Sequence, residues 1–459
     1  MTAYEQFLES KALVDKPSGF EPHEIKAALF DWQKDIVRWA IRRGRAACFE
    51  DCGLGKTIQE LEWGKQVAEE TGGMVLHLAP LAVGPQIRDE AAKFGYEVNM
   101  VEYQAACQPG VNITNFEKLD RFNADLFSGV IVDESSIMKS FAGVTRTKLI
   151  ERFRGMPYKS AWTATPAPND FMELANHAEF LGIMTRSEML ATFFAHDSGS
   201  TQTWRLKEHG RDAFWKWLCS WAVNIRNPSD LGYDGSDFIL PELTMEELIV
   251  DSDHKLDGYL IAMPASNLQE RRQARRASLG ERVAAIVDIF NVKHRFDQFI
   301  VWCDLNDESA SLAQLIDGAK EVAGKHDEQY RIDALQGFIS GKYRGLVTKP
   351  DIFGFGMNFQ HCHLAAYCGL SDSWELFYQS ARRIWRFGQN NPVTLYVVIS
   401  SQEGAVLSNI KRKEADAQRM NAEMLSFMKD IQSKNIRRLE RETECYNPQT
   451  RMDLPSWIA

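Results

Sequence analysis

Short apolar runs alternate with longer amphipathic segments along this chain, and the alternation occurs in two successive sets. Between the runs of the first set, residues 56–69 and 84–93 have the periodicity of helices. Such alternation is typical of a parallel sheet covered by helices. The apolar runs of the first set are residues 46–49, 75–79, 111–114, 130–133 and 159–163.

The second set predicts another α/β unit of the same kind. Its apolar runs are residues 299–302, 345–348, 364–367 and 395–399, and its expected helices are 280–290, 309–319 and 374–384. A chain of 459 residues also exceeds one ordinary hydrophobic core and suits two domains of about 200 residues. We therefore predict an α/β protein with a first domain at 1–240, a second domain at 255–435 and a tail at 436–459.

Residues 171–236 interrupt this rhythm. The segment is rich in aromatic residues, which are Trp204, Phe214, Trp215, Trp217 and Trp221. We expect a small helical insertion in which these side chains pack on the first domain, although an exposed platform for stacking bases is the alternative. The following residues, 237–251, are predicted to cross between the domains.

Charge and hydropathy restrict the possible partners. The net charge of −10 argues against a protein that holds nucleic acid by its overall charge, so any such contact must use local basic strips. Candidates are Arg271, Arg272, Arg275, Arg276 and 411–413, unless these side chains pair with acidic neighbours.

No apolar run approaches the roughly 18 residues of a membrane span, and the N-terminus lacks the pattern of a secretory signal. We expect a cytoplasmic protein without a membrane partner.

The sequence EDCGLGKT follows the first apolar run and opens a predicted helix. Gly53 and Gly55 would let the backbone curl so that its N–H groups face phosphates at the helix N-terminus. Lys56 would reach the β- and γ-phosphates of a nucleotide, and Thr57 would offer its hydroxyl to Mg²⁺. Glu50 stands where the usual pattern has its first glycine.

A second candidate group follows the apolar run 130–132, where Asp133 and Glu134 are adjacent. Buried carboxylates are costly unless they bind a cation, so we expect Asp133 to hold Mg²⁺ and Glu134 to polarise an attacking water. An acidic pair that caps the next helix is the alternative. Thr163 and Thr165, at the end of the next run, are expected to hydrogen-bond to these carboxylates, or simply to form a turn with Pro166.

The second domain carries Gln379, Arg383 and Arg386 at positions i, i+4 and i+7. In a helix this spacing places all three on one face, where the arginines could stabilise charge at a γ-phosphate presented by the first domain. A solvated or acid-paired helix face is the alternative. Upstream, the loop with Gly354 and Gly356 permits close approach to a nucleotide or to a nucleic-acid phosphate, unless it is an ordinary turn.

Several short motifs occur in order between residues 28 and 415. They are Phe30-x-Trp32-Gln33, EDCGLGKT, Ala79-Pro80-Leu81, Thr114-Asn115-Phe116-Glu117, DESS, TATPAPN, GFGMNFQ and QSARRIWRFGQNNPVTLYVVIS. This set resembles the superfamily-2 helicases (DEAD/DEAH-box-like ATPases), and within them the Swi/Snf-related branch. The resemblance also accounts for Glu50, because that branch has an acidic version of the phosphate loop.

The resemblance implies two tandem RecA-like domains with ATP and Mg²⁺ between them and Gln33 reading the adenine. It implies a compact motor, of the kind found in phages or mobile elements, that translocates on duplex DNA. A strand-separating helicase on DNA or RNA is one alternative, and an ATP-gated nucleic-acid clamp is another. Protein partners remain unknown. The residues expected to contact nucleic acid are Pro80, Thr114, Asn115, Thr348 and Lys349. The chain departs from the family in Ser135-Ser136, where many relatives have Ala-His or Gly-His.

Overall fold

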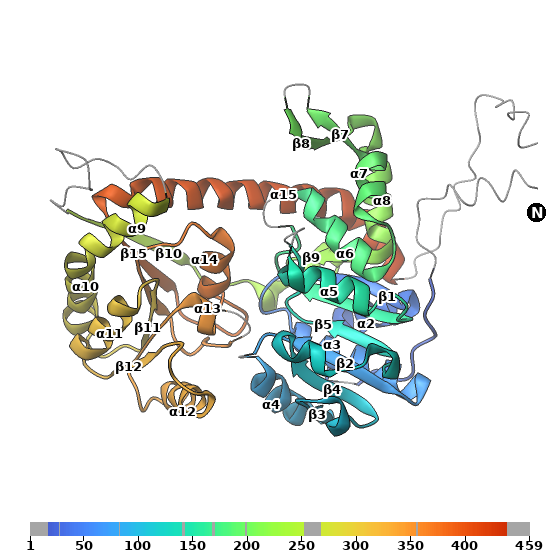
Figure 1. The fold of residues 1–459 in the computed structure, drawn as a ribbon, viewed down its shortest axis with the longest axis horizontal. Helices are drawn as coiled ribbons and strands as arrows, with labels where there is room; N and C mark the ends of the chain where they lie inside the picture. Colours follow the sequence, from blue (N-terminus) through green and yellow to red (C-terminus); the bar gives the residue numbers. More distant parts are fainter. Residues whose placement is uncertain are drawn as a thin grey trace, which may run out of the picture.

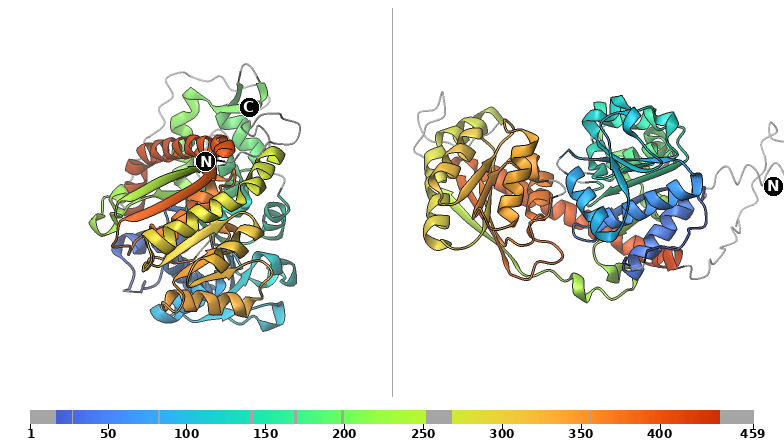
Figure 2. Two further views of the ribbon diagram at one scale, coloured as in Figure 1. Left: turned by 90° about the vertical axis from the view of Figure 1, so that its left-hand side faces the viewer. Right: turned by 90° about the horizontal axis from the view of Figure 1, so that it is seen from below.

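The computed structural model describes residues 17–437 except 27, 82, 140–142, 168–169, 198–199, 252–267 and 355–356. Two α/β units lie side by side, and each is built around its own sheet (Figure 1, Figure 2). All strand pairs within the two large sheets are parallel. The α/β class and the two-unit organisation agree with the prediction.

The first sheet has seven strands in the order β3-β4-β2-β5-β6-β1-β9. Their bounds are β1 Arg45–Glu50, β2 Met74–Ala79, β3 Val98–Met100, β4 Gly110–Asn115, β5 Gly129–Val132, β6 Tyr158–Thr163 and β9 Ala222–Ile225. Because successive side chains of a strand point to opposite faces, Ala46 and Cys48 enter one core while Ala47 and Phe49 enter the other. The sheet is therefore buried on both faces, as parallel sheets usually are.

Helices cover both faces of this sheet. The helices α2 (Asp31–Arg43), α3 (Lys56–Thr71) and α4 (Gly84–Phe94) pack on one face. The helices α5 (Val144–Arg152), α6 (Leu174–Leu181), α7 (Arg186–Phe193) and α8 (Arg211–Trp221) contribute to the core on the other face.

The second sheet has six strands in the order β10-β15-β14-β11-β13-β12. Their bounds are β10 Leu243–Val250, β11 Phe299–Cys303, β12 Ala319–Val322, β13 Gly345–Thr348, β14 Leu364–Cys368 and β15 Val393–Ser400. The helices α10 (Leu279–Asp288) and α11 (Asn306–Leu315) pack on one face, with α9 (Leu268–Ala277) nearby. The helices α12 (Glu328–Ile339), α13 (Pro350–Phe353) and α14 (Trp374–Ala381) pack on the other.

Two predictions about the middle of the chain need correction. Residues 237–251 do not simply cross between the units, because β10 pairs with β15 over eight residues and forms an edge of the second sheet. Its side chains are only partly buried, so its sequence lacks the apolar run of a central strand. The prediction also missed β12, since the helix expected over 309–319 already ends at Leu315.

The segment 171–236 is not purely helical. It contains an antiparallel hairpin of β7 (Phe194–Asp197) and β8 (Ser200–Leu206), and β9 completes the first sheet beside β1. Phe214, Trp215, Trp217 and Trp221 are at most 1% exposed, so these aromatic side chains pack in the first core and cannot offer a surface to bases.

A helix of 34 residues, α15 (Gly404–Arg437), runs across both units (Figure 1). Its first turns place Val406 and Ile410 in the core of the second unit. Farther along, Met424 and Met428 enter one core of the first unit and Ile436 enters the other. The C-terminal half of α15 therefore contributes side chains to both cores of the first unit.

We expect the substitution Met428→Ala to destabilise the first unit, because this side chain is fully buried at the contact between α15 and α8. Truncation of a buried methionine costs about 2–5 kcal/mol through lost burial and the cavity left behind. Urea denaturation measures the effect, and Lys429→Ala on the exposed side of α15 is the matched control, expected within about 0.5 kcal/mol of wild type. Equal midpoints for both variants would contradict the role assigned to α15.

Candidate active site

The predicted phosphate loop connects the end of β1 to the start of α3. Gly53 and Gly55 have φ of 90° and 74°, which glycine adopts without the penalty that a side chain incurs. Lys56 Nζ donates to the carbonyl oxygens of Glu50 at 2.9 Å and Asp51 at 3.2 Å. The loop thus curls around the ammonium group of Lys56 at the N-terminus of α3, and a helix N-terminus favours an anion.

Gln33, from α2, holds this loop from the side. Its Nε2 donates to the Leu54 carbonyl at 2.8 Å, and its Oε1 accepts from the Phe30 N–H at 2.9 Å. A Cβ on Gly55 would lie 2.7 Å from Gln33 Nε2, and the φ of 74° at this position also favours glycine. The structure therefore brings the predicted adenine-reading residue to the phosphate loop.

Asp133 and Glu134 follow β5 at the same edge of the sheet, because parallel strands end on one side. Glu134 has φ 52° and ψ 52°, and it is the single residue other than glycine with positive φ in the described part of the chain. Such strain for a non-glycine residue concentrates at functional sites. Glu134 Oε1 accepts from Thr163 Oγ1 at 3.1 Å, as the sequence predicted.

Burial gives the carboxyl groups of this region unusual pKa values. It raises the pKa of Glu50 and of Glu60 to about 8, and the nearby Lys56 opposes the shift in both cases. Burial, followed by the charges of Glu60 and Glu134, also holds the pKa of Asp133 well above its usual range. Clustered buried carboxyl groups of this kind favour a cation, since one lysine cannot balance them.

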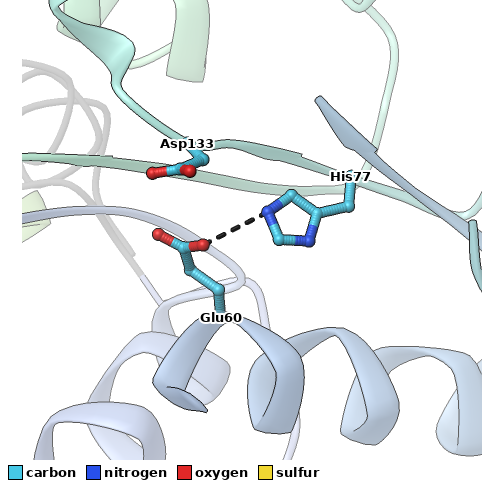
Figure 3. A group of neighbouring side chains, drawn as sticks. All are labelled: Glu60, His77 and Asp133. Atoms are coloured by element: carbon cyan, nitrogen blue, oxygen red, sulfur yellow. Dashed lines mark ion pairs between the residues drawn. The ribbon is translucent and has the colours of Figure 1, made fainter. Parts of the chain in front are cut away.

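The sequence reasoning did not single out Glu60 and His77, which meet Asp133 in the first unit (Figure 3). Both side chains are fully buried, and His77 Nε2 lies 3.2 Å from Glu60 Oε2. Burial lowers the pKa of His77 to about 4, so its ring is neutral at neutral pH. The sequence did contain a signal for this group, because Glu60 lies on the inner face of α3 and His77 interrupts an otherwise apolar strand.

The second unit contacts this site directly through α14 and the turn that follows it. Gln379 Nε2 approaches Glu134 Oε1 and Thr165 Oγ1, each at 3.4 Å, so the amide joins the two units at the carboxylate. On the same helix, Glu375 receives a hydrogen bond from Thr165 Oγ1 and forms an ion pair with Lys139. The predicted Gln379 therefore lies at the candidate site.

The arginines do not share a helix face, which corrects the prediction. Helix α14 ends at Ala381, and Arg383 and Arg386 lie in the turns beyond it. Arg383 Nη2 donates to Gln379 Oε1 at 2.6 Å, and its Nε donates to the Gly354 carbonyl at 2.9 Å. The second unit packs closely on the phosphate loop at these turns, since a Cβ on Gly53 would lie 2.8 Å from the Phe387 N.

Arg382, which the prediction omitted, also contacts the phosphate loop. Its guanidinium lies 2.8 Å from Asp51 Oδ2 and donates to the Cys52 carbonyl at 3.0 Å. Tyr378 OH donates to Asp51 Oδ1 at 2.6 Å. Burial alone would raise the pKa of Asp51, but Arg382 and Tyr378 together hold it below its usual value.

A cleft of about 1400 Å³ opens between the units beside this junction. Pro80, Thr114 and Asn115 line it from the first unit, and Asn358 and Gln360 face it from the second. The other two residues predicted to contact nucleic acid do not line it. Thr348 is fully buried, and its hydroxyl donates to the Val322 carbonyl at 2.9 Å. Lys349 lies outside the lining of the cleft. Gly356 of the neighbouring loop lies outside the described residues.

The basic candidates are largely paired with acidic groups, as the alternative reading expected. Arg271 pairs with Asp372, and the buried Arg275 pairs with Asp304 and Glu403. In α15, Lys411 pairs with Glu247 and Arg412 with Asp416, while Lys413 donates to the Asp372 carbonyl. The side chains of these paired residues are therefore engaged within the protein.

Comparison with known proteins gives no family for this chain, because no family model matches it and no curated protein matches it significantly. Among the described residues, no helix is long and apolar enough to cross a membrane. The geometry of the site therefore carries the functional argument.

We expect the substitution Asp51→Asn to weaken the contact between the units. It removes the charge that balances Arg382, of which 5% is exposed, while an amide can still accept from Tyr378. Leaving one partner of a buried pair alone costs about 3–5 kcal/mol, measured as a lower free energy of unfolding in urea. The control is Asp416→Asn, whose partner Arg412 is 65% exposed, with an expected cost below about 1 kcal/mol. Similar losses in both variants would show that Asp51 is not a junction residue.

We expect Glu50→Gln to change how stability depends on pH. Folding raises the pKa of Glu50 from 4.5 to about 8, so between these values the folded chain binds a proton that the unfolded chain has released. This group therefore lowers stability as pH rises through that window, by up to about 1.4 kcal/mol per pH unit.

Glutamine at position 50 cannot titrate but can still accept from Gln59 Nε2, which now donates to Glu50 at 2.7 Å. The variant should gain stability relative to wild type as pH rises from about 5 to 8, in urea titrations at each pH. As the control, Glu281 is exposed, and the free energy of unfolding of Glu281→Gln should change with pH as that of wild type does. If the free energy of unfolding of Glu50→Gln also followed wild type across this pH range, the raised pKa of Glu50 would be refuted.

Proposed function

We propose that this chain is an ATP-driven motor on nucleic acid, built from two RecA-like units and closest to the Swi/Snf-related branch of the superfamily-2 helicases. One observation carries the proposal. The phosphate loop and Glu134 of the first unit are in direct contact with the Gln379–Arg386 segment of the second. A nucleotide held by the loop would therefore meet groups from both units, and its state could change how the units contact each other.

In this proposal Lys56 leaves the loop carbonyls for the β- and γ-phosphates of ATP, while the loop N–H groups and the N-terminus of α3 bind the same anion. Thr57 and Asp133 would hold Mg²⁺, which supplies charge neutralisation at the phosphates. The carboxyl group of Asp133 fits that ion, because burial and the charges of Glu60 and Glu134 disfavour its ionised form, and a dication would offset both effects. Glu134, held by Thr163, would orient the attacking water and accept its proton.

The second unit would complete the site. Arg383 and Arg386 now donate to backbone carbonyls of their own unit, and the Nε of Arg386 has no hydrogen-bond partner among the described residues. Burial and the neighbouring Arg383 lower the pKa of Arg386 to about 10, so an anion at this position would be stabilising. A γ-phosphate would draw both guanidinium groups to it and then release them after hydrolysis.

We further propose that this cycle moves the chain along duplex DNA, with the cleft beside the junction as the path of a backbone. Pro80, Thr114 and Asn115 face that cleft from one unit and Asn358 and Gln360 from the other, which suits alternating grip. Contacts to phosphates carry little sequence information, so binding should depend on salt and only weakly on sequence.

The first test is ATP hydrolysis with no nucleic acid, single-stranded DNA, duplex DNA or duplex RNA. We expect duplex DNA to raise turnover strongly in wild type. Glu134→Gln should lower turnover by about 10²–10⁴-fold, because the amide cannot accept the proton of the water. The exposed Glu151→Gln in the same unit should hydrolyse ATP at the wild-type rate.

The other outcomes identify the rivals. Stronger stimulation by single strands or RNA would replace the duplex translocase with an unwinding helicase, which a forked duplex then tests. Stimulated hydrolysis without displacement of a DNA triplex would indicate an ATP-gated clamp. A rate independent of Glu134 and of every nucleic acid would end the motor proposal.

A further inference from the structure

Three side chains of the first unit converge from different elements (Figure 3). Glu60 comes from α3, His77 from the middle of β2, and Asp133 from the end of β5. One ligand atom of each lies within 4.8 Å of the other two. No other group of three such residues meets this condition within the described part of the chain.

The three residues, called the triad below, have few partners elsewhere. His77 and Glu60 are fully buried. Outside the triad, neither nitrogen of the His77 ring and neither oxygen of the Glu60 carboxyl group has a hydrogen-bond partner among the described residues. Buried polar atoms without partners cost about 1–3 kcal/mol each, and more when charged. The sheet and α3 thus hold three side chains that can bind a metal close together, although their unpartnered polar atoms lower the stability of the fold.

We propose that Glu60, His77 and Asp133 form a binding site for a divalent first-row transition metal, with Zn²⁺ as its representative. Two carboxylates and a neutral imidazole carry two negative charges, which a dication neutralises. The nitrogen ligand separates this site from the oxygen-only set expected for Mg²⁺, since imidazole favours zinc and its neighbours in the series.

The geometry suits such an ion. Ligand atoms at about 2.0–2.2 Å from zinc in a tetrahedral site lie roughly 3.3–3.6 Å from one another. His77 Nε2 and Glu60 Oε2 already have nearly this separation, at 3.2 Å. Three protein ligands leave a fourth position for water or for another oxygen.

The inference goes beyond the proposed function and can be tested without any nucleotide. Glu60 lies one helical turn after Thr57, so the ion would sit behind the expected position of Mg²⁺, and the two sites would share Asp133. The shared carboxylate would let the metal fix the orientation of Asp133 before Mg²⁺ and ATP arrive.

The experiment is a Zn²⁺ titration by calorimetry of the full chain after chelator treatment, in nucleotide-free buffer. We expect one high-affinity Zn²⁺ per chain. His77→Gln and Glu60→Gln should each weaken binding at least about 100-fold, because even the loss of a group outside the ligand set costs 10–100-fold. The matched control is His177→Gln. His177 is equally buried in the same unit, but it contacts Ser135 at 3.0 Å and lies outside the triad.

X-ray absorption of the wild-type chain with one equivalent of Zn²⁺ gives a readout that needs no variant. A shell of nitrogen and oxygen near 2.0–2.1 Å would support the triad, whereas sulfur near 2.3 Å would assign the ion to cysteines. Circular dichroism would check that each variant is folded. A sulfur shell, no binding, or unchanged affinity in both folded variants would overturn the proposal. ATP hydrolysis that depends on Glu134 would stand in any of these cases.

Discussion

The ion pair between Asp51 and Arg382 and the hydrogen bond between Gln379 and Glu134 join the two sheets of this protein. Both contacts lie at one edge of the first sheet, where β1, β5 and β6 end, because parallel strands deliver all their following loops to the same side. Helix α14 docks on those loops. The candidate nucleotide site therefore adjoins the interface between the units, and a ligand at the phosphate loop would lie next to the α14 segment.

The same edge concentrates costs that a merely structural junction would avoid. Glu134 adopts a left-handed conformation, and several carboxyl groups are buried with strongly raised pKa values. Backbone strain persists only where the surrounding structure enforces it. Buried carboxylates are costly unless they are paired or bind a cation. Two candidate cations fit different parts of this cluster. In the proposals made above, Mg²⁺ would bind Thr57 and Asp133 beside a nucleotide, and a transition metal would bind the histidine-containing triad.

Helix α15 restricts the motions that this arrangement allows. Its start is part of the second core, and Met424 and Met428 are part of the first. A helix that is packed in both units favours rotation about itself over full separation. In the proposed cycle, small changes at α14 would change the width of the neighbouring cleft while both cores stay intact.

The sequence by itself determined the class of fold and most of the first unit's site. Continuous apolar runs identified the buried central strands, and the loop from Glu50 to Thr57 was found because its glycines and lysine stand close together in sequence. It could not place β10 or β9, whose membership of a sheet depends on distant partners, β15 and β1. Tertiary structure alone decided that Arg382 reaches Asp51, and that Glu60, His77 and Asp133 meet. These residues are far apart along the chain, and only the packing of one unit on the other, or of α3 on its sheet, brings their charges together.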